Sequence, residues 1–148
     1  MLYFDTSFLI PLVVEEATSI QVERFVQSLT QELAVSHWTR AEITSALARE
    51  VRMGKLDKES ALAADAQLEA VLLKSFTTLA PTVDDFQLCK QYLSQYEVGL
   101  RAGDALHLAI ASRHQATAIY TLDRSLVKAG QHLRLPVKTG IHIARASP

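Results

Sequence analysis

The sequence predicts an α/β protein in which helices wrap a parallel β-sheet. Short apolar runs typical of strands alternate with helix-like periodic segments along the chain, and this alternation favours a parallel sheet. The 148 residues suit one domain, residues 1–148, with a proper core, and neither repeats nor a long linker divide it. An apolar content of 49% and a charged content of 21% are those of an ordinary globular protein.

The first apolar run, residues 1–4, is short and rich in aromatic residues, so we expect it to form a strand. Asp5 ends this run, and the hydroxyl pair at residues 6–7 opens a helix. Residues 8–14 are largely apolar, and Pro11 among them is tolerated only in the first turn of a helix. The chain is therefore expected to begin with a strand that leads directly into a helix.

The remaining elements are predicted from capping residues and apolar spacing. Strands are expected at residues 33–36, 76–79, 117–122 and 135–138, the last at a sheet edge because it contains a proline. Helices are expected at residues 18–29, 39–53, 58–73, 82–93, 105–114 and 123–129. Gly54 and Gly130 are expected to end two of these helices, and Asp57 and Thr82 to cap two others.

Four acidic residues lie at the ends of predicted elements rather than on helix flanks: Asp5, Glu42, Asp104 and Asp123. Asp5 and Asp123 follow strands, and parallel strands end at one edge of the sheet. Glu42 lies in the first turn of a predicted helix, and the helix that Asp104 opens must start near the same edge. We therefore expect the four carboxylates to converge, where they would repel one another unless a cation compensated their charge.

The predicted ligand set consists of oxygen atoms, since no cysteine or histidine group stands at ligand spacing. Oxygen ligands suit a hard ion such as Mg²⁺ or Mn²⁺. Carboxylate-held Mg²⁺ serves phosphodiester hydrolysis, in which the metal activates water and stabilises charge on the phosphate oxygens. The pattern therefore indicates metal-dependent phosphodiester chemistry.

Each acid also has a purely structural interpretation. Glu42 could close a capping box with Thr39, and Asp104 or Asp123 could complement a helix dipole, which is worth about 0.3–1 kcal/mol. Asp5 is harder to explain in this way, because the hydroxyl pair that follows it could cap the helix alone. A common site explains all four positions together.

Four sequence blocks contain these acids: residues 2–7, residues 39–43, residues 103–109 and residues 120–123. In order and spacing they resemble the signature blocks of PIN-domain ribonucleases, and within that family the VapC toxins of bacterial type II toxin–antitoxin modules. The resemblance implies a PIN-like fold, with a parallel sheet of about five strands between helices. It further implies Mg²⁺- or Mn²⁺-dependent endonucleolytic cleavage of RNA and inhibition by a cognate VapB-type antitoxin.

Carried over residue by residue, the resemblance makes Asp5 and Asp104 metal ligands, while Glu42 and Asp123 complete the acidic site directly or through water. Thr121 matches a hydroxyl residue that the family often places two residues before its last acid. Many relatives carry a further acid shortly after that block, whereas the residues that follow Asp123 here are Arg-Ser-Leu-Val-Lys. The sequence therefore leaves open whether one or two ions bind.

Further residues near these blocks could contact an RNA substrate or support the site. Arg40, Arg101 and Arg124 each flank an acidic block and could hold RNA phosphates, or could be solvated surface charges. His107 follows the third acid by one helical turn, so it could touch the site or could be a buried, hydrogen-bonded histidine between two leucines. Ser7, close to the first acid, is the remaining candidate.

Composition restricts the setting of the protein. The net charge of −1 gives no global sign of nucleic-acid binding, so any basic surface must be local. The single cysteine, Cys89, allows no internal disulfide, which suits a reducing cytoplasm. Neither a signal-like segment nor an apolar run near the roughly 20 residues that span a bilayer is present, so we expect a cytoplasmic protein without membrane contact. The apolar stripe within residues 61–73 is either core or one side of a homodimer interface.

Two other functions remain open at this point. A metal-dependent phosphatase could use Asp5 as a phosphoryl acceptor, but it would need a second acid where this chain has Ser7, and Lys128 is only a modest candidate for the expected lysine. A catalytically degenerate PIN-like domain that only binds RNA would lack one or more of the acids, and all four are present. The sequence is silent on which RNA is cut and on the identity of the antitoxin.

Overall fold

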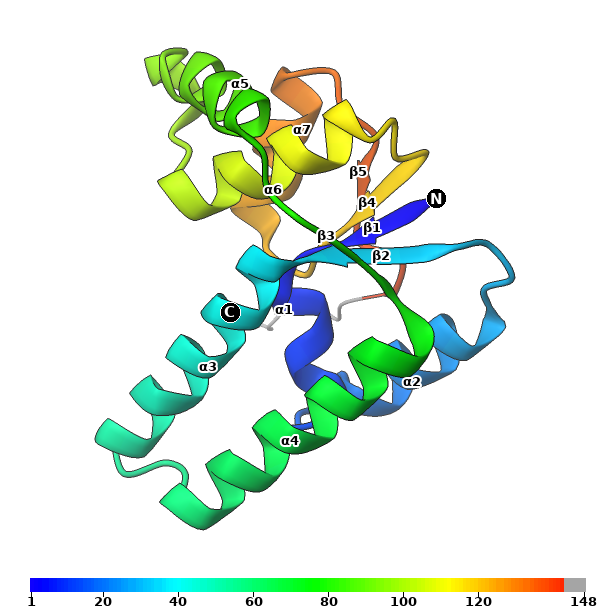
Figure 1. Ribbon diagram of the computed structural model, residues 1–148, viewed down its shortest axis with the longest axis vertical. Coiled ribbons are helices and arrows are strands. Elements are labelled where there is room, and N and C mark those ends of the chain that lie inside the picture. The colour runs from blue at the N-terminus through cyan, green and yellow to red at the C-terminus, as the bar shows by residue number, and fades with distance from the viewer. Residues whose placement is uncertain (143–148) are drawn as a thin grey trace.

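A five-stranded parallel sheet forms the centre of the computed structural model, which describes residues 1–142 except the side chain of residue 73 (Figure 1). The strands are β1 (Leu2–Phe4), β2 (Leu33–Ser36), β3 (Thr77–Leu79), β4 (Ala118–Tyr120) and β5 (Val137–Lys138). Their order across the sheet is β3-β2-β1-β4-β5, and every neighbouring pair is parallel. This confirms the predicted α/β fold.

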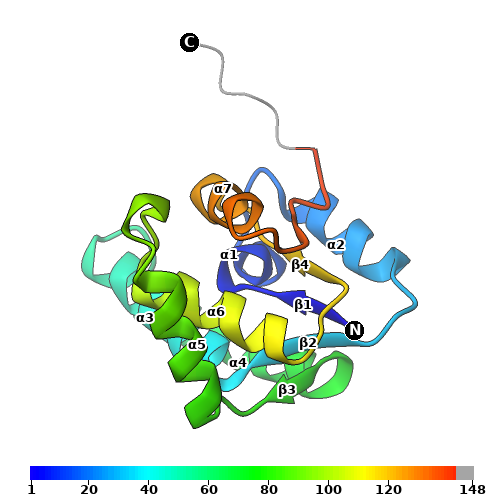
Figure 2. The same cartoon turned by 90° about the horizontal axis from the view of Figure 1, so that it is seen from above.

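Helices cover both faces of the sheet, also as predicted. One face carries α1 (Thr6–Leu9), α2 (Ser19–Ser28), α3 (His37–Arg52) and α4 (Lys58–Ser75) (Figure 1). The other carries α5 (Val83–Leu93), α6 (Ala102–Arg113) and α7 (Arg124–His132), with α5 and α6 side by side in Figure 2. Two short 3₁₀ helices, η1 (Ile10–Leu12) and η2 (Tyr96–Val98), complete the described part of the chain, and Pro11 lies at the start of η1.

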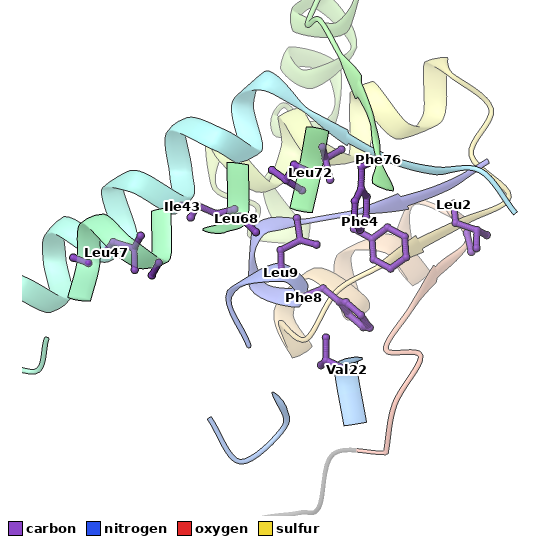
Figure 3. Packing of buried hydrophobic residues seen from close by; sticks show 14 residues of the cluster. Leu2, Phe4, Phe8, Leu9, Val22, Ile43, Leu47, Leu68, Leu72 and Phe76 are labelled. Carbon is purple, nitrogen blue, oxygen red and sulfur yellow. The ribbon is translucent and has the colours of Figure 1, made fainter. Parts of the chain in front are cut away.

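Side-chain alternation along β1 divides the core into two layers. Leu2 and Phe4 face α1–α4, whereas Tyr3 faces α5–α7, because successive side chains of a strand point to opposite faces. Phe4 lies at the centre of an aromatic group, with its ring centroid 5.3 Å from that of Phe8 and 5.2 Å from that of Tyr120. Figure 3 shows Phe4 and Phe8 within this layer. The alternation matters for function because it directs Tyr3 toward α6.

The topology brings the predicted acidic blocks to one edge of the sheet. β1 pairs with both β2 and β4, so the chain order across the sheet reverses at β1, and such a reversal leaves a crevice at the carboxyl ends of the strands. Asp5 follows β1 directly, α3 follows β2 directly, and Thr121 follows β4 directly. α6 precedes β4 and returns the chain to the amino edge, so α6 begins near the carboxyl edge.

The start of α3 differs from the prediction. Ser36 is the N-cap, its side chain accepts a hydrogen bond from the Thr39 backbone N–H, and Thr39 completes the capping box from inside the helix. Glu42 is therefore in the second turn of α3, and the alternative interpretation of Glu42 as part of a capping box with Thr39 is wrong. Both hydroxyl residues can serve as caps, but Ser36 ends β2 in the extended conformation that an N-cap requires.

The end of α7 also differs from the prediction, because the helix continues past Gly130 to His132. A Cβ atom at position 130 would lie only 2.6 Å from Cβ of Val137 and would overlap its side chain. The glycine is thus required for the close approach of α7 to β5 and does not end the helix.

Most of the apolar stripe on α4 is core. Leu68 and Leu72 are 2% and 1% exposed, whereas Leu62 is 62% exposed. Figure 3 shows Leu68 and Leu72 within the same layer as Ile43 of α3. Across the described residues, every helix is too short or too polar to cross a membrane.

Candidate active site at the carboxyl edge of the sheet

All four predicted acids line one cavity of about 480 Å³ at the carboxyl edge of the sheet: Asp5, Glu42, Asp104 and Asp123. They come from four separate elements, since Asp5 caps α1, Glu42 lies on α3, Asp104 lies in the first turn of α6 and Asp123 caps α7. Segments that are far apart in the chain therefore supply a single acidic surface.

Three hydrogen bonds hold the Asp5 carboxylate in this site. Its Oδ1 accepts hydrogen bonds from Ser7 Oγ at 2.8 Å and from the Phe8 backbone N–H at 3.3 Å, and its Oδ2 accepts one from Thr121 Oγ1 at 2.9 Å. Burial raises the pKa of Asp5 to about 6, although the charge of His107 and these hydrogen bonds act in the opposite direction. Asp5 is also the N-cap of α1, so the expectation that the hydroxyl pair could cap this helix alone is wrong.

Glu42 accepts two short hydrogen bonds at the same oxygen. Thr6 Oγ1 and His107 Nε2 each lie 2.5 Å from Glu42 Oε2. Burial by itself would raise the pKa of Glu42, but the hydrogen bond and charge of His107, aided by the hydrogen bond of Thr6, lower it below the ordinary value. Asp5 and Glu42 thus have pKa values shifted in opposite directions within one cavity, an arrangement typical of functional sites.

Asp104 and Asp123 share a cationic neighbour. Arg101 Nε lies 3.6 Å from Oδ2 of Asp104, and Arg101 Nη2 lies 3.9 Å from Oδ2 of Asp123. Burial and the charge of Asp123 raise the pKa of Asp104. Burial would also raise the pKa of Asp123, but hydrogen bonds from Ser125 and the charge of Arg101 lower it. The Arg101 side chain is 81% exposed, so both ion pairs are weak.

His107 combines the two roles that the sequence left open. It is 1% exposed, and one ring nitrogen contacts Glu42 while the other, Nδ1, lies 2.8 Å from Tyr3 Oη. Thr121 and Ser7 both contact Asp5 through their hydroxyl groups, and these two hydroxyl oxygens are 3.1 Å apart.

None of the three predicted arginines lines the cavity among the described residues, although Arg101 pairs with Asp104 and Asp123 beside it. Arg40 forms a paired interaction with Glu69 of α4, with both N–H···O distances at 2.6 Å, and Arg124 is absent from the cavity lining in the described part of the chain. Arg49 and Arg52 line the cavity instead. Their spacing of seven and ten residues from Glu42 along α3 is the signal that predicts a shared helix face.

A family model describes residues 2–131 as a PIN domain. The chain belongs to the PIN domain family. The match covers most of the chain and includes all four acidic positions, so it confirms the resemblance that the sequence blocks indicate. A search of curated proteins finds no match.

Solved structures share the fold of this PIN domain. VapC20 of Mycobacterium tuberculosis, a sarcin-ricin loop cleaving toxin, has a TM-score of 0.71 and 21% identity over 88% of this chain and 95% of its own. FitAcB from Neisseria gonorrhoeae has a TM-score of 0.74 and 20% identity over 97% of this chain and 100% of its own. VapBC-1 from nontypeable Haemophilus influenzae has a TM-score of 0.66 and 20% identity over 95% of this chain and 98% of its own. At this identity the likeness concerns the fold.

The donor set of this PIN domain fits a divalent metal ion in its chemistry. Carboxylate oxygens from four elements surround one cavity, and the mutual charge effect of Asp104 and Asp123 is one that a cation relieves. Within residues 1–142 no three acidic, histidine or cysteine side chains are already grouped around one point.

Proposed function

We propose that this PIN domain is a Mg²⁺- or Mn²⁺-dependent endoribonuclease and the toxin of a toxin–antitoxin pair. The observation that carries the proposal is the convergence of four carboxylates from distant elements on one cavity at the carboxyl edge of the sheet. Their environments differ, since burial raises the pKa of Asp5 while hydrogen bonds lower that of Glu42. A set of acids with divergent pKa values around one cavity suits hydrolytic chemistry better than structural support.

In this proposal Asp5 and Asp104 hold the metal ion, and Glu42 and Asp123 complete the site directly or through water. When bound, the metal activates a water molecule and stabilises charge on the phosphate oxygens. The protein's own contribution is rigidity, because Ser7 and Thr121 fix both oxygens of Asp5.

RNA binding in this proposal depends on cationic and donor groups at the rim of the cavity. Arg49 and Arg52 line it on the α3 side, and Arg101 approaches Asp104 and Asp123 from α6. Arginine side chains at such positions bind phosphate oxygens and fix the register of a nucleic acid without reading its sequence. The overall charge of −1 makes this a local basic surface.

The toxin assignment draws on the neighbours with the same fold. VapC20 of Mycobacterium tuberculosis is a sarcin-ricin loop cleaving toxin, and another structure with this fold is a toxin–antitoxin complex from Klebsiella pneumoniae. We infer a VapB-type antitoxin whose basic side chain enters the acidic cavity and forms charge-assisted hydrogen bonds with its carboxylates. We also infer a cytoplasmic location and a homodimer.

Cleavage of single-stranded RNA by the purified chain tests the proposal. Mg²⁺ or Mn²⁺ should support cleavage, a chelator should abolish it, and Ca²⁺ should restore it poorly because of its longer and looser coordination. Asp5→Asn and Asp104→Asn should each lose more than the roughly 10–100-fold that removal of an outer hydrogen-bond partner costs. Glu59→Gln, on the exposed start of α4, serves as the control.

Two outcomes would contradict parts of the proposal. Cleavage by Asp5→Asn in excess chelator would exclude the metal mechanism, and RNA binding without cleavage would indicate a degenerate domain. If expression of the active chain leaves host cells unharmed, the toxin role is wrong while the nuclease role stands. A phosphatase that uses Asp5 as acceptor is not favoured, because both oxygens of Asp5 accept hydroxyl hydrogen bonds and Ser7 occupies the position of the second acid.

A further inference from the structure

A chain of buried hydrogen bonds leads from the interior of the sheet to Glu42. Tyr3 Oη, on β1, lies 3.1 Å from Ser36 Oγ and 2.8 Å from Nδ1 of His107. On the opposite side of the imidazole ring, His107 Nε2 lies 2.5 Å from Oε2 of Glu42. Tyr3 and Ser36 are 0% exposed and His107 is 1% exposed, so water does not compete for the bonds among these three residues.

The ionised Glu42 determines which ring nitrogen donates. A carboxylate only accepts hydrogen bonds, so Nε2 of His107 must donate to Oε2. On the other side of the ring, Tyr3 Oη lies 2.8 Å from Nδ1. The ring is thus held from both sides, and its orientation cannot change unless both bonds break.

The two carboxylate oxygens of Glu42 have different surroundings. Oε2 accepts from His107 and from Thr6, both at 2.5 Å. Oε1 packs against Gly103, where an added Cβ would lie only 2.7 Å from it. The same added Cβ would lie 3.3 Å from Trp38 Nε1, a buried atom that has no hydrogen-bond partner within the described residues. Oε2 is therefore occupied by protein donors, whereas Oε1 accepts no hydrogen bond from the described residues and is left available to a ligand.

We propose that His107, held in place by Tyr3, is a positioning residue that fixes Oε2 of Glu42 and presents Oε1 to the bound metal or its water. The proposal rests on the proposed nuclease function. It adds Tyr3 of β1 and His107 of α6 as the residues that hold Glu42 of α3 in place. Outer hydrogen bonds of this kind orient a ligating side chain, and their loss typically costs roughly 10–100-fold in metal affinity or activity. A histidine that served packing alone would be replaceable by leucine without such a loss.

A double-mutant cycle tests whether His107 acts through Glu42. His107→Leu should lower kcat by about 10–100-fold with little change in KM for RNA, because Glu42 is not expected to bind the RNA backbone. In a Glu42→Gln background the same substitution should have little further effect, because the acceptor that His107 positions has already changed. His107→Gln, whose amide can donate in place of Nε2, should recover part of kcat. His114→Leu, near the exposed end of the same helix, should match the wild type.

Binding of Mn²⁺ alone, measured by isothermal titration calorimetry, gives a readout that does not depend on catalysis. His107→Leu should weaken Mn²⁺ binding by about 10–100-fold, and His107→Gln by less. If His107→Leu does not fold, Tyr3→Phe replaces it in both experiments, because it removes only the hydroxyl group behind the ring. Tyr3→Phe should then lower kcat and Mn²⁺ affinity in the same direction but less strongly.

The failure of this inference is distinguishable from failure of the proposed function. If the wild type cleaves RNA and binds Mn²⁺ while a folded His107→Leu does both equally well, the positioning role is wrong and the nuclease stands. Equal losses from His107→Leu in the wild-type and Glu42→Gln backgrounds would likewise contradict it. If the wild type binds Mn²⁺ but does not cleave RNA, the proposed function fails, and the calorimetric comparison still decides the role of His107. A wild type that binds no Mn²⁺ would overturn both.

Discussion

Asp5 has a structural and a chemical role that oppose each other. As the N-cap of α1 and the acceptor of two hydroxyl hydrogen bonds, it stabilises the turn between β1 and α1. Its burial penalises the charge that a metal ligand needs, and this raises its pKa from the ordinary value of 3.8 to about 6. The metal-free protein therefore carries an acid that is harder to ionise than an ordinary aspartate, and its charge at neutral pH costs folding free energy.

Substitution of Asp5 by Asn should stabilise the metal-free protein at pH 7.5. A pKa that folding raises contributes stability that is fully present below pH 3.8 and is lost as the pH rises through about 6. That difference in pKa corresponds to a stabilisation of at most about 3 kcal/mol by the substitution. The weaker hydrogen bonds of the amide reduce this gain. Thermal unfolding in excess chelator should show Asp5→Asn several degrees above the wild type at pH 7.5, with the gap closing near pH 4.

The exposed substitution Glu15→Gln is the matched control and should shift the melting temperature little at any pH. An Asp5→Asn protein that is less stable than the wild type at both pH values would show that the cap and hydroxyl bonds outweigh the burial of charge.

Gly103 shows how one element makes room for another. It lies in the first turn of α6, and a Cβ there would be 2.7 Å from Oε1 of Glu42 and 3.3 Å from Nε1 of Trp38. The absence of a side chain at this position allows the Glu42 carboxylate of α3 to reach the start of α6. The contact joins two blocks that the sequence singles out separately.

Gly103→Ala should therefore lower activity while leaving the fold intact. Alanine is up to about 1 kcal/mol more favourable than glycine inside a helix, and the atom that it meets is the end of a flexible side chain. The free energy of unfolding should change by less than about 1 kcal/mol, but Glu42 Oε1 must move, so kcat should fall. Ala102→Gly, exposed in the same turn, is the control and should lose some stability without a similar loss of kcat. Full activity of a folded Gly103→Ala would mean that Oε1 is not the functional oxygen.

The order and type of most elements could be predicted from the sequence because they depend on local spacing and caps. Asp57 and Thr82 do cap α4 and α5, as their positions before periodic segments indicate. Ser36 and Thr39 are both suitable N-caps for α3, and only the position at which β2 ends decides between them. The role of Gly130 depends on its contact with Val137, which belongs to a later strand. Local patterns do not contain such long-range contacts.

The candidate site could be predicted in part for the same reason. The acids lie at element ends, which topology brings together, so their convergence follows from the alternation of strands and helices. Helix spacing puts Arg49 on the same face of α3 as Glu42, but only the packing of α3 against α4 brings Arg40 to Glu69. The contacts of His107 with Tyr3 and Glu42 join residues 104 and 65 positions apart, and no sequence spacing predicts them.

At the scale of the whole molecule, the two helical layers differ in what they leave exposed. Leu68 and Leu72 of α4 are part of the core, which removes most of that stripe from consideration as a dimer interface. On the other side of the sheet, Val83 and Phe86 of α5 are 73% and 55% exposed. They are one helical turn apart on one face, and exposed apolar patches of this kind often mark protein interfaces.

The proposed homodimer should therefore form through α5. Light scattering coupled to size-exclusion chromatography should show the wild type as a dimer and Phe86→Asp as a monomer, because a buried, unpaired carboxylate would oppose association. Ile20→Asp is the matched control: Ile20 is 65% exposed on α2, in the opposite layer, and its substitution should leave the dimer intact. Dissociation by Ile20→Asp but not by Phe86→Asp would move the interface to the other layer. A wild type that stays monomeric at high concentration would contradict the dimer itself, and the cavity, which one chain supplies alone, would be unaffected.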